Sequence, residues 1–129
     1  MILLDTHVLI WMFNDPAKLS KNAVRAIRGA AGAGGLAISA MTLWELAHLA
    51  TRGGINPRGT VEAFVRKITA HVAIQPITVE IAVIASQFPA TYPADPTDKL
   101  IGATALAEGM ALVTADQKIL QSNVVKTIW

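Results

Sequence analysis

The sequence predicts an α/β fold, a three-layer α/β/α sandwich whose central, mainly parallel sheet of about five strands has helices on both faces. Two observations predict it. Short apolar runs without polar alternation, the first at residues 2–5, are typical of strands buried on both faces. Longer segments with helical periodicity separate these runs, and a helix between two strands favours their parallel pairing. Because no internal repeat or long linker interrupts this alternation, we expect residues 1–129 to form one domain.

The composition is that of a globular protein with a buried core. Hydrophobic residues make up 53% of the chain and charged residues 16%, which argues against disorder. No apolar run reaches the roughly 18 residues needed to span a bilayer, and no basic region precedes the first apolar stretch. The absence of cysteine excludes disulfides and thiolate metal sites and fits a reducing cytosol. We therefore expect a cytoplasmic protein, whose formal charge of +2 permits a polyanionic partner without requiring one.

The first elements are a strand and two helices. ILLD (2–5) predicts a buried strand, and HVLIWMF (7–13) predicts a short helix that an Asp-Pro pair ends. Ser20 is a suitable N-cap for an amphipathic helix over LSKNAVRAIRGA (19–30), and the glycine-rich stretch after it marks the end of that helix.

The middle of the chain predicts a second strand followed by two helices. LAIS (36–39) has the apolar character of a strand. Ser39 is a suitable N-cap for a helix over MTLWELAHLATR (41–52), which a glycine pair ends. TVEAFVRKITAH (60–71) has the spacing of an amphipathic helix.

The last part of the chain continues the same alternation. Apolar runs predict strands at residues 72–77, 110–114 and 123–129. Helical spacing predicts helices at residues 79–88, 99–109 and 116–120. Thr78 is the expected N-cap of the first of these helices, and Gly109 is expected to end the second.

The acidic residues fall at places that such a sheet uses for ligands. Ligands bind beyond the carboxyl ends of parallel strands. Asp5 ends the first predicted strand, and Asp116 lies two residues beyond the fourth. Glu45 lies on the apolar helix that follows the second strand, and Asp95 and Asp98 stand at the start of a later helix. We therefore expect these carboxylates to converge at one edge of the sheet.

Each acid also has a purely structural explanation. The four aspartates would serve as helix N-caps, and Glu45 would pair with Arg52 or His48. Converging carboxylates repel one another, however, at a cost on the order of 4 kcal/mol for two charges 4 Å apart at an effective dielectric near 20. Protonation or a divalent cation relieves that repulsion. An all-oxygen donor set favours Mg²⁺ or Mn²⁺, which can activate water against a phosphodiester.

Four segments resemble, in their order and spacing, the motifs of the PIN-domain ribonucleases and, more closely, of the VapC toxins of bacterial and archaeal toxin–antitoxin pairs. These segments are LLDTH (3–7), TLWELA (42–47), DPTDKLIGATA (95–105) and LVTAD (112–116). The resemblance covers essentially the whole chain. It implies a PIN-like three-layer fold, and it implies a Mg²⁺- or Mn²⁺-dependent endoribonuclease that cleaves RNA with metal-activated water. It also implies a cognate VapB-like antitoxin that occupies the site, and commonly a homodimer.

The resemblance also implies roles for individual residues. The catalytic and metal-binding acids of the family correspond to Asp5, Glu45, Asp98 and Asp116. Asp95 matches a further acid of the DPxD subgroup, so we include it among the metal ligands and leave open that it is a helix cap. Thr6 and Thr114 match small hydroxyl residues that would orient a ligand or water, or would bond only to the local backbone.

Basic and aromatic side chains are candidates for RNA contacts. Six basic residues would bind phosphates: Arg52, Arg58, Arg66, Lys67, Lys99 and Lys118. Lys99 and Arg52 are favoured, because one adjoins Asp98 and the other ends the helix of Glu45. Trp11 and Trp44 would stack on bases, or would fill the core or a partner groove. The apolar segment 79–88 would be core or a dimer face.

Other classes of function are less consistent with the sequence. His7, His48 and His71 would suggest a zinc hydrolase, but no HExxH motif is present; His7 and His48 would otherwise bond to the nearby acids or pack. A Mg²⁺-dependent phosphatase-like domain also has an acid after its first strand, yet DTH lacks the second acid that such enzymes use. A catalytically inactive PIN-fold binding module would be expected to have lost at least one of the acids that this chain retains.

Overall fold

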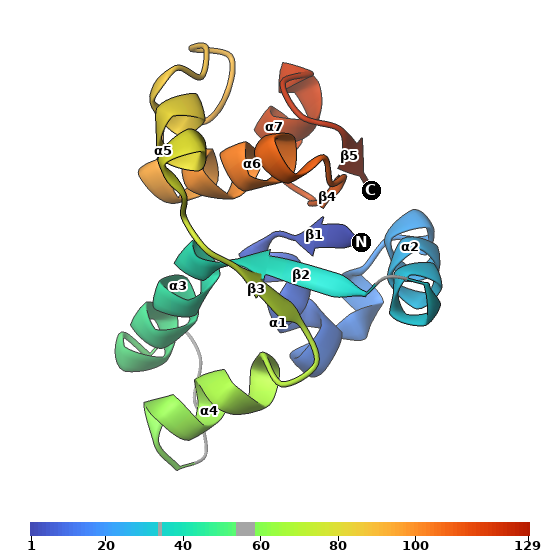
Figure 1. Cartoon of the computed structure of the whole chain (residues 1–129). Helices are drawn as coiled ribbons and strands as arrows, with labels where there is room; N and C mark the ends of the chain where they lie inside the picture. The colour runs from blue at the N-terminus through green and yellow to red at the C-terminus, as the bar shows by residue number, and fades with distance from the viewer. Residues whose placement is uncertain (34, 54–58) are drawn as a thin grey trace.

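A five-stranded parallel sheet forms the centre of the molecule, with helices on both of its faces (Figure 1). The computed structural model describes residues 1–33, 35–53 and 59–129. The strands are β1 (Ile2–Leu4), β2 (Leu36–Ser39), β3 (Ala73–Gln75), β4 (Leu112–Val113) and β5 (Thr127–Ile128). They lie in the order β3-β2-β1-β4-β5, and every neighbouring pair is parallel. The predicted α/β/α architecture is therefore confirmed.

The helices follow the predicted segments closely. They are α1 (Thr6–Asn14), α2 (Lys21–Gly32), α3 (Ala40–Thr51), α4 (Val61–Ile68), α5 (Val79–Ser86), α6 (Pro96–Glu108) and α7 (Gln117–Ser122), with a short 3₁₀ turn, η1, at Pro16–Lys18. The predicted N-caps Ser20, Ser39 and Thr78 each accept a backbone N–H of the first turn. Gly109 ends α6 with a φ of 65°, a left-handed conformation that suits glycine. In the described ranges, no helix is both long and apolar enough to cross a membrane.

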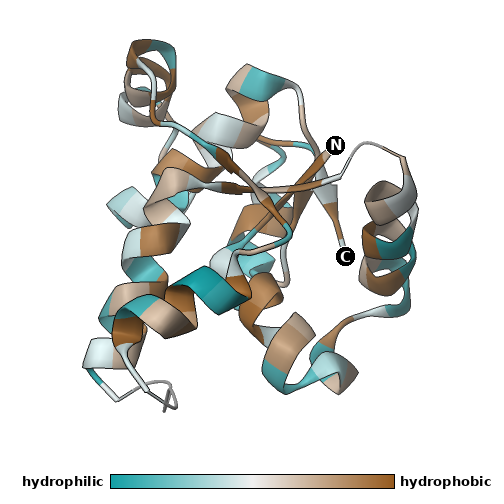
Figure 2. Cartoon of the chain, turned by 60° about the horizontal axis from the view of Figure 1, so that its bottom comes forward, coloured by the Kyte–Doolittle hydropathy of each residue, from teal (hydrophilic) through white to brown (hydrophobic). Residues whose placement is uncertain are grey.

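The two faces of the sheet build two separate parts of the core. Leu4, Ile38 and Val113 point toward the layer formed by α1, α2, α3 and α4. Their neighbours in sequence, Leu3 and Leu112 among them, point toward α6 and α7. Because both faces are covered, the central strands β1, β2 and β4 are mostly hydrophobic, in keeping with the apolar colouring at the centre of Figure 2, and this explains the absence of polar alternation in their sequences.

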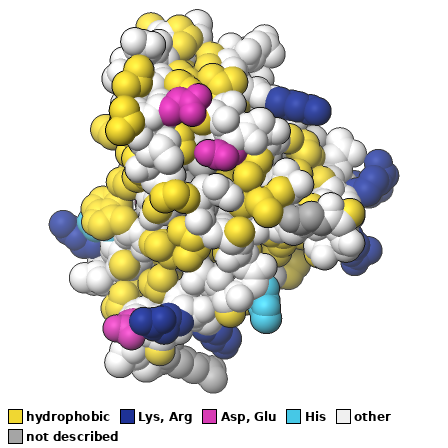
Figure 3. All heavy atoms as spheres, viewed as in Figure 1, with side chains coloured by type: hydrophobic (Ala, Val, Ile, Leu, Met, Phe, Trp, Pro, Cys, Tyr) yellow, Lys and Arg dark blue, Asp and Glu magenta, His cyan; other side chains and the backbone are white. Residues whose placement is uncertain are grey.

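Helix α5 lies outside α6 rather than on the sheet. Ile81 and Ala85 pack against Ala103 of α6, whereas Val79 is 83% exposed and Val83 48% exposed. Figure 3 shows hydrophobic side chains gathered on the surface in the region of α5. The segment predicted as core or dimer face therefore packs on one side and exposes an apolar surface on the other.

The strand order determines where the site forms. Because β1 lies between β2 and β4 and all three are parallel, their carboxyl ends open at the same edge. Asp5 follows β1, α3 follows β2 directly, and the segment that carries Thr114 and Asp116 follows β4. Helix α6 begins at this edge as well, since Asp95, Pro96 and Thr97 at its start line one cavity with Glu45 of α3.

Candidate active site

Asp5 is buried at the end of β1, with 4% of its surface exposed, and joins two strand ends. Its Oδ1 accepts the backbone N–H of Thr6 at 2.8 Å, which makes Asp5 the N-cap of α1. Its Oδ2 accepts the hydroxyl of Thr114 at 2.8 Å, across from the end of β4. The strand therefore ends at Leu4 rather than at Asp5, and the carboxylate is held from two sides.

His7 ties the same two segments together. Its Nε2 accepts the backbone N–H of Ala115 at 3.0 Å, and its Nδ1 lies 3.8 Å from Oδ2 of Asp5. Since Nε2 is the acceptor, the neutral ring carries its proton on Nδ1, on the side that faces Asp5. The imidazole thus links the start of α1 to the segment after β4; its Nδ1 is near Asp5, but at 3.8 Å it makes no hydrogen bond to that acid.

Glu45 projects from α3 and is held by a threonine pair. The hydroxyl of Thr6 donates to Oε1 of Glu45 and lies 3.0 Å from the hydroxyl of Thr42. Burial raises the pKa of Glu45, the hydrogen bond from Thr6 lowers it, and the negative charges of Asp5 and Asp95 raise it further. The expected pairing with Arg52 or His48 is not found, since among the described residues neither forms an ion pair with Glu45.

Asp98 is a partly buried carboxyl whose pKa is affected by the charges of all four other acids. Its pKa is raised from an ordinary 3.8 to about 7. Partial burial is the largest cause, followed by the charges of Asp5, Asp95, Asp116 and Glu45. The charges of the four other predicted acids therefore all act on Asp98 at this edge of the sheet.

Asp95 and Asp116 are both N-caps. Oδ1 of Asp95 accepts the backbone N–H of Thr97 at 2.8 Å at the start of α6. Oδ1 of Asp116 accepts the backbone N–H groups of Lys118 and Ile119, at 2.9 and 3.1 Å, at the start of α7. The capping explanation is therefore correct for these two residues as well as for Asp5.

The donor chemistry of this cluster fits a hard divalent cation. Carboxylate oxygens are the ligands that Mg²⁺ and Mn²⁺ prefer. Burial and then four negative charges raise the pKa of Asp98, and no positive charge is among the causes that act on it. In the described part of the chain, however, no three acidic or histidine side chains are gathered closely enough to hold an ion. The acids thus face a common region without forming a closed coordination sphere, and the three-histidine zinc site is not found there either.

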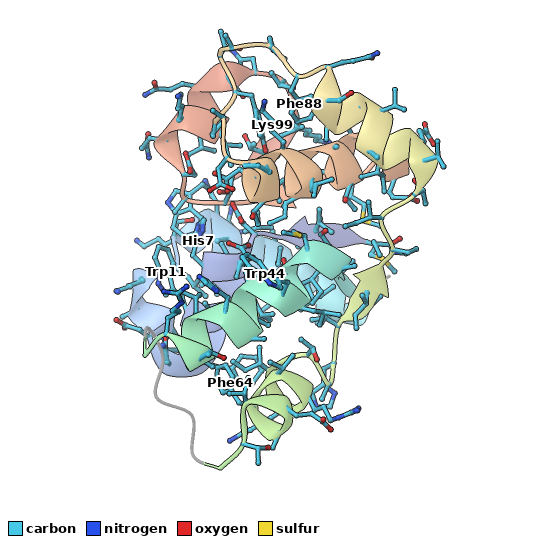
Figure 4. The ribbon with its side chains drawn as sticks, turned by 90° about the vertical axis from the view of Figure 1, so that its left-hand side faces the viewer. His7, Trp11, Trp44, Phe64, Phe88 and Lys99 are labelled. Carbon is cyan, nitrogen blue, oxygen red and sulfur yellow. The ribbon has the colours of Figure 1, made fainter. Side chains whose placement is uncertain are left out.

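A cavity of about 470 Å³ opens beside Glu45. It is lined by residues of α3 and of the start of α6, namely Met41, Trp44, Glu45, His48, Leu49, Asp95, Pro96 and Thr97. Figure 4 shows Trp44 and His7 on the same side of the molecule. Trp11 instead packs against Trp129 and His7, so of the two tryptophans considered for base stacking, Trp44 is the one at the cavity.

The favoured basic residues are not gathered at the acids. Lys99 lines a different cavity, with Ala85 and Ser86 of α5, and Figure 4 shows it near Phe88, away from His7 and Trp44. Arg52 is exposed at the end of α3, one turn beyond His48. Of the remaining candidates, Arg66 pairs with Glu62, Lys67 lines a cavity between α1 and α4, Lys118 is exposed on α7, and Arg58 lies outside the described residues.

Two contributors to the site carried no signal in the sequence. The hydroxyl of Tyr92, buried beneath α6, donates to the backbone carbonyl of Asp98 at 2.9 Å. Burial and the charges of Asp5, Asp98 and Asp116 raise the pKa of Tyr92, so its hydroxyl remains a donor. The hydroxyl of Thr42 lies within hydrogen-bond distance of that of Thr6. In the sequence, Thr42 stands among apolar residues of a helix, a position that indicates only burial.

The chain is similar to known proteins over nearly its full length. Residues 2–124 match the PIN domain family. A curated relative, Ribonuclease VapC22 of Mycobacterium tuberculosis, is 37% identical over 118 residues, covering 92% of this chain and 88% of that protein. Two solved structures share the fold: VapBC2 from Rickettsia felis bound to a promoter DNA fragment (TM-score 0.77, 17% identity, 98% of this chain and 97% of that chain) and DNA-bound VapBC from Salmonella typhimurium (TM-score 0.75, 18% identity, 98% and 97%).

Proposed function

The chain belongs to the PIN-domain family, and we propose that it is the toxin of a type II toxin–antitoxin pair, an endoribonuclease that hydrolyses RNA phosphodiester bonds with Mg²⁺ or Mn²⁺. The relative that shares 37% of its residues carries the name of a ribonuclease, VapC22. The proposal treats residues 1–129 as one domain, which is consistent with the single sheet.

The observation that carries the proposal is the electrostatic state of Asp98. Burial raises the pKa of Asp98 most, and the negative charges of Asp5, Asp95, Asp116 and Glu45 raise it further, to about 7, so this carboxyl belongs to a site with an excess of negative charge. Burial of such a cluster without compensation costs stability, so a structural role alone does not account for it. Binding of a divalent cation does account for it, and perturbed carboxyl groups of this kind are typical of functional sites.

The residues of the site have two proposed roles: the acids bind the cation, and two threonines fix acids by hydrogen bonds. Asp5, Glu45, Asp98 and Asp116 would bind the cation, with Asp95 as a further ligand. When bound, such an ion lowers the pKa of water and offsets negative charge on the phosphate. Thr114 and Thr6 fix the carboxylates of Asp5 and Glu45 through their hydroxyls. They act on the ligands themselves rather than on a substrate.

The proposed partners follow from the same relationship. Solved structures with this fold are complexes named VapBC, which supports a VapB-like antitoxin as the partner of this chain. The exposed apolar side of α5, at Val79 and Val83, is a surface suited to a second copy of the chain and hence to a homodimer. We propose the cytoplasm as the location of this chain, because cellular RNA is its proposed substrate.

The proposal is tested by cleavage of total cellular RNA with Mg²⁺, Mn²⁺ or EDTA. Asp5→Asn and Asp98→Asn keep the shape of each side chain and remove its charge, so we expect metal-dependent cleavage by the wild type and loss of at least 100-fold, about 2.7 kcal/mol, in each variant. Asp15→Asn is the matched control, because Asp15 pairs with Lys18 at 3.9 Å outside the acidic cluster.

The outcomes separate the proposed enzyme from an inactive binding module. Cleavage that survives EDTA, or that Asp98→Asn leaves intact, contradicts a metal-dependent site at these acids. An absence of cleavage by the wild type with every ion, together with a melting temperature that Mn²⁺ does not change, favours the binding module.

A further inference from the structure

Trp44 and His48 form a flat aromatic surface on α3. They lie one helical turn apart, their ring centroids are 4.7 Å apart, and their planes differ by only 15°. His48 therefore covers one face of the indole ring. Trp44 is nevertheless 54% exposed, so the remaining face and edges of the ring are open.

This aromatic surface opens into the cavity of the acidic site. Trp44, Glu45 and His48 line the same cavity of about 470 Å³, a size within the range of ligand pockets, and Asp95 lies on its opposite side at the start of α6. The ring is thus next to two of the acids that would bind the metal ion. Figure 4 shows Trp44 and His7, the neighbour of Asp5, on the same side of the molecule.

We propose that Trp44, held flat by His48, is a stacking subsite for one nucleobase of a single-stranded RNA whose phosphate lies at the acidic cluster. This inference rests on the proposed function. An RNA phosphate held at the acidic cluster through a divalent ion has a nucleoside on each side of it, and Trp44 lines the cavity that Glu45 and Asp95 also line. Aromatic side chains stack on unpaired bases of any sequence, because every base has a π-face.

The polar groups in the cavity favour a base over an apolar partner segment. An apolar side chain placed on Trp44 would also bury the carboxylates of Glu45 and Asp95, which costs free energy without a compensating partner. A base covers the ring with its face while its edge stays polar, and its N–H groups can donate to carboxylate oxygens. The exposed Arg52 lies one turn beyond His48, where it can accompany the phosphate backbone.

The test measures RNA binding separately from cleavage. Fluorescence anisotropy with short labelled oligoadenylate and oligouridylate is recorded in an Asp98→Asn background, which prevents cleavage. We expect Trp44→Ala to weaken binding about 5- to 100-fold and Trp44→Phe to retain most of it. Phe13→Ala is the matched control, because Phe13 is an aromatic residue of similar exposure, 48%, that lines a different cavity, and it should leave binding unchanged.

A second measurement assigns the loss to stacking. Oligonucleotides that lack one base at successive positions should bind the parent protein more weakly at one position, and the same omission should have no further effect in Trp44→Ala. Circular dichroism confirms that the variant is folded.

Three outcomes overturn the subsite. If the wild type cleaves RNA and Trp44→Ala binds and cleaves as well as the wild type, the subsite is wrong and the proposed function stands. If Trp44→Ala keeps its RNA affinity and loses only binding to an antitoxin, the surface belongs to a protein partner. If no form of the protein binds or cleaves RNA, the proposed function and the subsite are both wrong.

Discussion

Replacing Asp98 by asparagine is expected to stabilise the protein when no divalent ion is bound. The pKa of Asp98 is raised from 3.8 to about 7, first by burial and then by the charges of the four other acids. Between these two values the folded protein keeps a proton that the unfolded chain has lost. The free energy of unfolding therefore falls as pH rises from about 4 to about 7, and it stays lower above pH 7. Asparagine has no charge to bury and removes this dependence.

The size of the effect follows from the pKa shift. A change from 3.8 to about 7 corresponds to about 4 kcal/mol if the full shift acts on stability. Asp98 is only partly buried, so solvent screens its interactions, and we expect about 1–2 kcal/mol. For a domain of this size that corresponds to a rise in melting temperature of roughly 4–8 °C at pH 8. At pH 4 and below, wild type and variant should differ little.

Thermal unfolding followed by circular dichroism in EDTA, at several pH values between 4 and 8, measures this directly. Glu62→Gln is the control, because Glu62 is an exposed carboxylate whose partner is Arg66 at 3.0 Å. It should change stability by no more than about 0.5 kcal/mol across this range. If Asp98→Asn is no more stable than the wild type at pH 8, the charge cluster inferred around Asp98 does not exist.

Three further predictions test the surroundings of the site. His7→Ala leaves the backbone N–H of Ala115 without its acceptor, so we expect the free energy of unfolding, measured in urea, to fall by about 1–2 kcal/mol. RNA cleavage should also become slower. Unchanged stability would show that the imidazole does not join the start of α1 to the segment after β4. Gly102→Ala should lower the free energy of unfolding by about 1–3 kcal/mol, because the added Cβ would lie 2.2 Å from the hydroxyl oxygen of Tyr92. Gly29→Ala is the comparison: its Cβ meets no atom within 4 Å, so it should stabilise its helix by up to about 1 kcal/mol. Equal effects of the two substitutions in urea unfolding would contradict this packing. If the exposed side of α5 forms the proposed homodimer, Val83→Asp should convert the dimer to a monomer in light scattering while its circular dichroism remains that of the folded chain. A dimer that persists would exclude this side of α5 as the interface.

The fold was predictable because its strands are hydrophobic on both faces. Leu3 and Leu4 point into opposite parts of the core, so period-two alternation is absent and a continuous apolar run remains. The differences lie at the ends of the elements. Asp5 caps a helix instead of extending β1. The third strand, at the edge of the sheet, spans only Ala73–Gln75 of the predicted 72–77, because Pro76 follows it and has no N–H to donate.

The position of the acids was predictable, but their support was not. Topology alone brings the ends of β1, β2 and β4 to one edge, which is sufficient to group the carboxylates. The contact of His7 with Ala115 joins residues 108 positions apart, and no local pattern reports such a contact. Adjacency in sequence does not give Lys99 the surroundings of Asp98, and its contact with phosphate stays a prediction. Successive residues on a helix point in different directions, so Lys99 does not share the surroundings of Asp98 and instead lines a cavity with α5.

The helix-cap and active-site explanations of the aspartates are compatible, because a carboxylate has two oxygens. In Asp95 and Asp116 the capping bonds go to Oδ1, and within the described ranges Oδ2 of neither residue has a hydrogen-bond partner. The cap therefore fixes the direction in which the second oxygen points and leaves that oxygen available to bind a cation. Asparagine caps helices as well as aspartate does, so an Asp→Asn change retains the cap and removes only the charge. Such variants separate metal binding from helix capping, whereas alanine variants would change both at once.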